Sequence, residues 1–193
     1  MLRAGRGVRG AKSATLRRMP NSQKKLQELD ELIDGIDTAM LTTRRPDGHL
    51  VSRPMATQGR ISEADLWFVT NIETHKDEEI NFDPNVNCSY YNMKTREWVS
   101  VSGVARISKD RHLIKTLYKP DWKIWFGDEG GKKDGGPNDP RLALIFVDID
   151  SVTYMKNDKS KPMILWEIIK SRVTGKAAEI GDTREITGAE LMD

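Results

Sequence analysis

The side chains of this sequence that are best suited to chemistry are three polar groups within one short stretch. Arg53 lies inside a predicted strand, Thr70 ends the next predicted strand, and Lys76 opens the helix predicted after it. A guanidinium, a hydroxyl and an ammonium group all donate hydrogen bonds to phosphate oxygens. Thr74, just before the lysine, would add a second hydroxyl. We therefore expect these groups to converge on a ligand that carries a phosphate.

Arg53 has two interpretations. It shares one face of its predicted strand with the apolar side chains of Val51 and Met55. A charge among apolar neighbours must be paired or must bind a ligand. The sequence leaves open whether that partner is a phosphate or a nearby carboxylate. Pro54, the next residue, removes a hydrogen bond from the strand ladder and indicates an edge, a bulge or an opening.

Lys76 lies in the first turn of its predicted helix, and Thr74 and Asp77 have a spacing that resembles a capping box. A cation there is mildly unfavourable against the helix dipole, and a bound anion would reverse that effect. A solvated surface lysine is the alternative interpretation.

Aromatic side chains gather beside a glycine-rich loop that spans residues 127–140. Trp122, Trp125 and Phe126 precede this loop. They form either a small satellite hydrophobic cluster or a platform over a flat ring, within one subunit or across a dimer.

The sequence gives little support for a disulfide, a metal site, a common nucleotide-binding motif or a catalytic side chain. Cys88 is the only cysteine, so an intrachain disulfide is impossible, and its apolar strand face predicts a core position. His49, His75 and His112 fall in separate elements, so no metal site is expected. The sequence contains no nucleophile elbow, P-loop or dinucleotide-binding glycine motif. No side chain stands out as a catalytic acid, base or nucleophile.

Composition is that of one soluble globular domain. The chain has 193 residues, of which 37% are apolar and 31% charged. Six basic residues and no acidic ones fall within residues 1–22, so the remainder is acidic, which argues against nucleic-acid binding. No apolar run is long enough to span a membrane, and the basic start lacks the apolar segment of a secretory signal. We expect a cytoplasmic protein, although the basic segment leaves a targeting peptide open.

The hydrophobic patterns predict a mainly β domain with a few short helices. We expect a basic extension over residues 1–21, one domain over 22–175, and a loose polar tail over 176–193. About six strands with few helices favour an antiparallel barrel over alternating βαβ units. Gly103 inside a long strand marks a bulge or a close backbone approach. The predicted helices span 22–35, 74–82, 110–119 and a segment around Ile164, Leu165, Ile168 and Ile169; the strands span 38–44, 49–57, 64–71, 86–90, 98–107 and 142–154.

Many short motifs, in a fixed order, carry a resemblance to a known family. The chain resembles the pyridoxamine 5′-phosphate oxidase-like split-barrel flavoproteins, in particular the general stress protein 26 branch. The resemblance extends over roughly residues 25–175. Its motifs lie at residues 39–44, 47–48, 52–55, 66–70, 76, 79–80, 84–87, 99–103, 125–126 and 139–140.

The resemblance implies a six-stranded antiparallel split barrel, usually a homodimer, with FMN at the subunit interface. By this resemblance Arg53, Pro54 and Met55 line the flavin, whereas Val69 and Thr70 meet the ring edge and the ribityl-phosphate. Thr74 and Lys76 hold the phosphate, and Ser100 and Trp125 reach the cofactor bound mainly to the partner subunit.

The resemblance leaves the activity open between two classes. One is an FMN-dependent oxidoreductase that acts on a small molecule or accepts electrons from a nicotinamide donor. The other is a non-catalytic flavin-binding protein with a stress or sensing role. A true pyridoxamine phosphate oxidase is a weaker third, and FAD, a deazaflavin or haem remain alternative ligands because one fold hosts several cofactors.

Overall fold

The computed structural model describes residues 21–157 and, beyond them, residues 163, 166, 169–172, 175, 181–187 and 190. The predicted basic extension lies outside the described residues, except for its last position. Ile164, Leu165 and Ile168 of the last predicted helix also lie outside them. Within the described ranges, no helix has both the length and the apolar character needed to cross a membrane.

The chain alternates short helices with long strands, close to the order that the sequence predicts. The element bounds differ from the predicted ones by one or two residues at most ends. The elements are α1 (Asn21–Asp34), β1 (Thr38–Arg44), β2 (Leu50–Ala56), β3 (Leu66–Asn71), α2 (Lys76–Phe82), β4 (Asn85–Tyr91), β5 (Trp98–Ser108), α3 (Arg111–Leu117), a 3-10 turn (Pro120–Trp122), α4 (Lys123–Phe126), β6 (Leu142–Lys156) and β7 (Asp182–Thr187).

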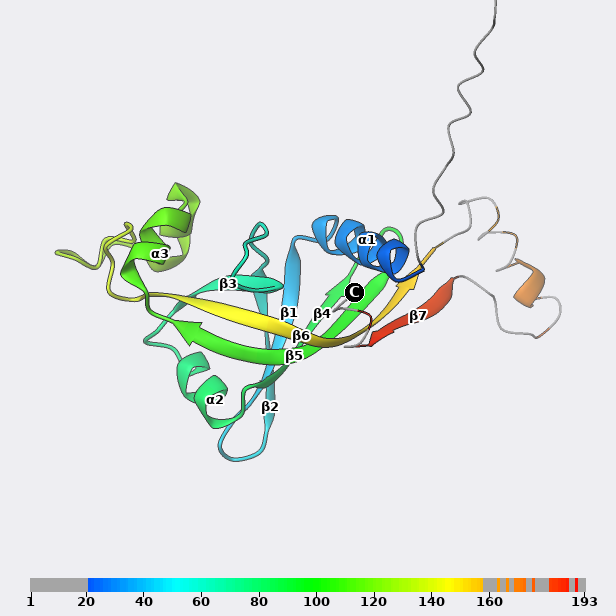
Figure 1. Cartoon of the computed structure of the whole chain (residues 1–193), viewed down its shortest axis with the longest axis horizontal. Helices are drawn as coiled ribbons and strands as arrows, with labels where there is room; N and C mark the ends of the chain where they lie inside the picture. The colour runs from blue at the N-terminus through cyan, green and yellow to red at the C-terminus, as the bar shows by residue number, and fades with distance from the viewer. Residues whose placement is uncertain are drawn as a thin grey trace, which may run out of the picture.

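In the described part of the chain, seven antiparallel strands form one curled sheet, in which six follow the order β2-β1-β4-β5-β6-β3 and β7 pairs with β6 (Figure 1). The expected mainly β architecture, an antiparallel split barrel with flanking helices, is confirmed. β6 pairs with β5 along one edge. Along its other edge, β3 covers its first half and β7 its second half. As Pro54 indicates, its strand β2 lies at the end of the sheet order.

The core lies inside the curl because side chains alternate along the strands. Leu41, Cys88 and Val101 occupy paired positions on β1, β4 and β5, and all three are fully buried. The predicted core position of Cys88 is therefore confirmed, and burial raises the pKa of its thiol to about 12. α1 and α2 add apolar side chains to the same cluster, such as Leu32 and Ile80.

Gly103 marks the predicted bulge in β5. The pairing of β5 with β6 shifts register between Ser102 and Gly103. A Cβ atom at Gly103 would stand 2.3 Å from the carbonyl oxygen of Asp148, so only glycine fits. The bulge increases the local twist, which helps the long strands to curl.

The prediction of a loose C-terminal tail is wrong for Asp182–Thr187. This segment pairs with β6 as β7, and its Ile186 is fully buried in the core. Arg184 of β7 donates to Glu28 of α1. The sequence did not reveal this strand because one isoleucine among polar residues gives almost no periodic signal. The strand forms because the second half of β6 offers backbone groups that need hydrogen-bond partners.

Candidate functional site

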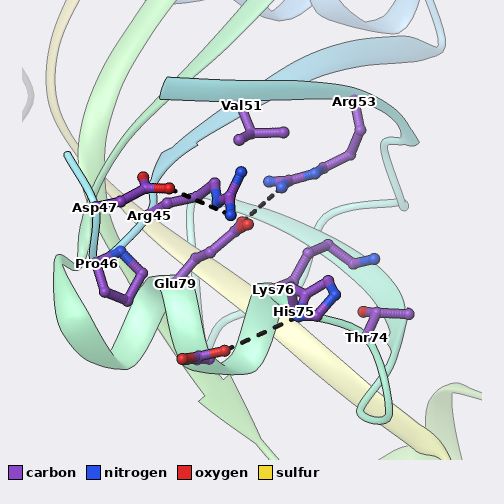
Figure 2. A pocket seen from close by; sticks show the side chains of 10 residues that line it. Arg45, Pro46, Asp47, Val51, Arg53, Thr74, His75, Lys76 and Glu79 are labelled. Atoms are coloured by element: carbon purple, nitrogen blue, oxygen red, sulfur yellow. Dashed lines mark hydrogen bonds and ion pairs between the residues drawn. The ribbon is translucent and has the colours of Figure 1, made fainter. Parts of the chain in front are cut away.

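Two cavities meet at Thr74 and Lys76, in front of α2. The first, the hairpin cavity, measures about 560 Å³ and lies between the β1–β2 turn and the start of α2 (Figure 2). The second, the aromatic cavity, measures about 440 Å³ and lies between β2, β3 and the 122–126 segment. The hairpin cavity is lined by Arg45, Pro46, Asp47, Val51, Arg53, Thr74, His75, Lys76, Glu78 and Glu79. The aromatic cavity is lined by Thr38, Pro54, Met55, Ala56, Gln58, Val69, Thr70, Asn71, Thr74, Lys76, Trp122, Trp125 and Phe126.

Arg53 is held by a buried carboxylate. Its guanidinium donates to Glu79 Oε2 at 2.5 Å and to Thr43 Oγ1, and Thr43 Oγ1 donates to the same oxygen of Glu79 at 2.6 Å. The ion-pair interpretation of Arg53 is therefore what the structure shows. Arg53 still lines the hairpin cavity, where its guanidinium points to Glu79 (Figure 2) and its side chain is 19% exposed.

Glu79 is the site residue that our reasoning about chemistry missed. Its side chain is only 4% exposed, although glutamate is seldom buried without a partner. A signal was present, because residue 79 follows Lys76 by three positions and therefore lies on the same helix face. The sequence alone does not indicate that the face of α2 that carries Lys76 and Glu79 is directed towards Arg53.

Lys76 is a cation without a counter-ion. Within the described part of the chain, no residue forms a hydrogen bond or an ion pair with its Nζ atom. Burial, and then the positive charge of Arg53, lower the pKa of Lys76, while Glu79 opposes this shift. The side chain is partly buried, which does not fit a fully solvated surface lysine. An anion beside Nζ would replace the water that the ammonium group has lost.

Thr74 lies at both cavities but does not cap α2. The helix begins at Lys76 after His75, and no side chain accepts a hydrogen bond at that cap. The expected capping-box start at Thr74 is therefore wrong. The Thr74 hydroxyl instead donates to the carbonyl oxygen of Asn71 at 2.7 Å and closes the turn after β3. Thr70 is buried and borders only the aromatic cavity.

The two interpretations of the aromatic residues apply to different side chains. Trp122 and Phe126 are buried in a second hydrophobic cluster, where Trp122 packs edge-on against Trp67 with ring centroids 6.1 Å apart. Trp125 is 79% exposed, although it lines the aromatic cavity. Its indole therefore remains available to cover a flat ligand, with Pro54 and Val69 on the sheet side.

A buried ion pair holds the base of the 127–140 loop. Arg141 is fully enclosed and donates to Asp139 Oδ2 at 2.7 Å and to the carbonyl oxygens of Phe126 and Gly127. These contacts attach the loop to the segment that carries Trp125. Arg141 was not singled out from the sequence, although the neighbouring Asp139 belongs to the family motif.

Ser100 lies apart from both cavities. It is on β5, where its hydroxyl accepts from Asn87 Nδ2 at 2.8 Å. The structure therefore brings the predicted residues Pro54, Met55, Val69, Thr70 and Trp125 to the aromatic cavity, Arg53 to the hairpin cavity, and Thr74 and Lys76 to both. Among the described residues, no group of three or more His, Cys, Asp or Glu side chains is arranged to hold a metal ion.

One family model and several known proteins are similar to this chain. The family model described as "Pyridoxamine 5'-phosphate oxidase like" matches residues 24–179. Protein bli-3 of Neurospora crassa is 37% identical over 172 residues, which cover 88% of this chain and 82% of that protein. General stress protein 26 of Bacillus subtilis is 26% identical over 106 residues, 52% of this chain and 68% of that protein. The crystal structure of the general stress FMN/FAD binding protein from Xanthomonas citri superposes with a TM-score of 0.57 at 27% identity and covers 71% of this chain and 92% of that one.

Proposed function

Because the chain belongs to the pyridoxamine 5′-phosphate oxidase-like family, we propose that it is a general stress flavoprotein that binds FMN. The phosphate lies at Lys76 and Thr74, and the ring system lies in the aromatic cavity. The name of the Xanthomonas citri relative, an FMN/FAD binding protein, supports this choice of ligand class.

The observation that carries the proposal is the unpaired Lys76. A partly desolvated ammonium group at the junction of two cavities gains most from a ligand with a compact negative charge. A phosphate monoester has that charge and three acceptor oxygens. The hydroxyl of Thr74 adds a polar group at the same point.

The lining of the aromatic cavity fits a flavin ring. Pro54, Met55 and Val69 supply apolar surface on the sheet side, and the exposed indole of Trp125 supplies a flat face opposite. Thr70 and Thr74 supply polar groups between the ring and the phosphate. A mostly apolar cavity with a few directed polar groups is typical of a cofactor site.

A bound flavin would supply hydride or electron transfer, and the side chains would orient it and exclude water. Lys76 is the one titratable side chain among the described residues that line the aromatic cavity. We therefore propose an FMN-dependent oxidoreductase that acts on a small molecule or a nicotinamide donor without a dedicated acid–base pair. The same observation also favours the second candidate, a flavin-binding protein that does not turn over.

The test is flavin binding by Lys76→Met, with Lys94→Met as control, because Lys94 is an exposed lysine outside both cavities. We expect wild type and the control to show oxidised-flavin absorbance and to release FMN on denaturation. Loss of a charge-assisted phosphate contact should weaken FMN binding in Lys76→Met by about 1.5–3 kcal/mol. Unchanged affinity in Lys76→Met, or no FMN binding by wild type, would refute the site. Anaerobic bleaching by NADH or NADPH then separates the oxidoreductase from the non-catalytic candidate.

A further inference from the structure

Lys76 lies in a segment rich in carboxylates, yet it pairs with none of them. Residues 73–83 contain five acidic side chains and, besides His75, one basic side chain, that of Lys76. Residues three or four apart on a helix are within reach of one another, so several of these carboxylates could pair with the lysine. In the described part of the chain, no ion pair or hydrogen bond reaches its Nζ atom. The partners of the carboxylates therefore decide whether Lys76 is available to a ligand.

Each of these five carboxylates lies beside a basic side chain other than Lys76. The pairs are Glu73 with Lys133 at 2.6 Å, Asp77 with Lys109 at 3.5 Å, Glu78 with His75 at 3.9 Å, Glu79 with Arg53 at 2.5 Å and Asp83 with Arg44 at 3.0 Å. Figure 2 marks the pairs of His75 and Glu79. Four of the five basic partners lie outside residues 73–83. The tertiary structure thus engages the carboxylates that would otherwise compete for Lys76.

Lys133 is the partner that lies farthest along the chain. It belongs to the 127–140 loop, and its Nζ atom donates to Glu73 Oε1 in the turn between β3 and α2. This hydrogen bond raises the pKa of Lys133. The same Nζ atom lies 3.6 Å from Glu129, which pairs at 2.6 Å with the buried Arg141. Lys133 is therefore part of a charge network with a buried anchor and not a lone surface ion pair.

The backbone of the turn that carries Glu73 is attached to the same anchor. The backbone N–H of Ile72 donates to the carbonyl oxygen of Arg141 at 2.8 Å. The side chain of Glu73 is half exposed, so its direction depends on its ion pair with Lys133 and not on packing. Without that ion pair, the carboxylate would lie only three positions before Lys76 with no cation of its own.

We infer that Lys133 is a positioning residue of the proposed phosphate site, because it holds the Glu73 carboxylate and so keeps Lys76 available to the phosphate. This inference rests on the proposed function, in which the FMN phosphate lies at Lys76. A Glu73 carboxylate released from Lys133 would repel the phosphate and compete with it for the ammonium group. Lys133 itself lines neither cavity. The 127–140 loop thus tunes the affinity for a phosphorylated flavin without contacting the phosphate.

The experiment titrates flavin-free protein with FMN and with riboflavin, which lacks the phosphate, and compares Lys133→Met with Lys132→Met. Lys132 is a matched control, because it is the neighbouring exposed lysine and has no ion-pair partner among the described residues. We expect Lys133→Met to weaken FMN binding by about fivefold, the effect of one additional charge near the phosphate, and added salt to reduce the difference. Riboflavin binding by Lys133→Met, and the binding of both ligands by Lys132→Met, should stay unchanged.

Two further variants separate the charge of Lys133 from its place in the loop. Glu73→Gln, added to Lys133→Met, should restore the FMN affinity of wild type, because a neutral amide neither repels the phosphate nor pairs with Lys76. Lys133→Arg, which keeps the positive charge, should bind FMN as wild type does. A purely structural role of Lys133 in the loop would not be rescued by Glu73→Gln.

Three outcomes would overturn the inference. If wild type and Lys133→Met bind FMN equally well, the inference fails and the proposed function stands. Equal weakening of FMN and riboflavin in Lys133→Met, or no restoration by Glu73→Gln, would also refute it, because Lys133 would then act through the structure of the loop. If FMN does not bind to wild type, both the proposed function and the inference fail.

Discussion

Glu79 and Lys76 lie three residues apart on α2, and both border the hairpin cavity. Their charges are opposite, yet each has a different partner. Glu79 forms an ion pair with Arg53. Lys76 forms no such pair, and the charges of Arg53 and Glu79 act on its pKa only from a distance and in opposite directions. Of Arg53, Lys76 and Glu79, the charge that no neighbouring side chain in the described part of the chain neutralises is therefore that of Lys76.

At the residue scale, we expect Glu79→Gln to destabilise the fold by about 3 kcal/mol, because it leaves the Arg53 guanidinium without its charged partner. The control is Glu78→Gln, since the side chain of Glu78 is 68% exposed while that of Glu79 is 4% exposed. Urea unfolding followed by circular dichroism measures both. Equal free energies of unfolding for the two variants would show that the Arg53–Glu79 pair is not a structural element.

Lys76 should carry a stability penalty in the flavin-free protein. Its pKa is lowered by burial, so the unfolded chain binds more protons than the folded one as the pH rises towards 10.5. The contribution of Lys76 to stability therefore becomes more favourable with rising pH in that window. We expect Lys76→Met to be at least as stable as wild type at pH 7 and to lose this part of the pH dependence. Thermal melts at several pH values measure it, and a Lys76→Met variant less stable than wild type at pH 7 would contradict it.

At the scale of elements, α2, β2 and the 127–140 loop determine where the residues that line the two cavities lie. α2 carries Lys76 and Glu79, the edge strand β2 carries Arg53, and the loop base fixed by Arg141 supports the segment with Trp125. The aromatic cavity is therefore bordered by a sheet edge on one side and by a tethered loop on the other. Its shape therefore depends on contacts of Arg141 and Asp139, which do not line the cavity.

We expect Arg141→Met to cost about 3–5 kcal/mol, because the Asp139 carboxylate would remain buried without its partner. The guanidinium of Arg141 holds the pKa of Asp139 at about 2, below its ordinary 3.8. A lowered carboxyl pKa contributes stability above pH 3.8 that is lost as the pH falls towards 2. Denaturant titrations from pH 7 to low pH should show this loss in wild type.

Two controls isolate the Asp139–Arg141 pair. At neutral pH, Asp139→Asn should have a lower free energy of unfolding than wild type. Its free energy of unfolding should not show the further decrease that titration of Asp139 causes in wild type at low pH. Arg60→Met, which alters an exposed pair, should change stability by less than about 1 kcal/mol. If Arg141→Met behaves like Arg60→Met, the buried pair does not hold the loop.

At the scale of the whole molecule, the outer face of the sheet carries an exposed apolar side chain, Met40. Met40 of β1 pairs with Ser89 of β4, and Ser89 pairs with Ser100 of β5, so the three lie in one row. Met40 is exposed, and Ser100 lies away from both cavities. We propose that a homodimer forms through this face, which would bring Ser100 near a cofactor held by the partner.

A charge within this face should separate the dimer. We expect Met40→Glu to run as a monomer in light scattering coupled to size-exclusion chromatography, because a buried unpaired carboxylate is costly. Met93→Glu, which changes an exposed methionine between β4 and β5, should leave the dimer intact. A wild-type protein that is monomeric at micromolar concentration would refute the dimer.

Much of the fold follows from local patterns in the sequence. The strand positions, the bulge at Gly103 and the core position of Cys88 were all predicted, because strand periodicity and glycine geometry act over a few residues. β7 was missed, since its burial rests on Ile186 alone. The expected helix cap at Thr74 was wrong because α2 begins at Lys76, so His75 and not Thr74 occupies the cap position, while the Thr74 hydroxyl donates to the carbonyl oxygen of Asn71.

The sequence by itself determined that Arg53, Thr70, Thr74 and Lys76 carry groups that can donate hydrogen bonds to a phosphate, since residue types are local properties. Only the tertiary structure decided how they divide their roles. Arg53 meets Glu79 across 26 positions of the chain, and among the described residues that pairing leaves Lys76, on the same helix face as Glu79, without an ion-pair partner. The physical reason is that ion pairs and cavities form between elements distant in the chain, whose approach no local pattern specifies.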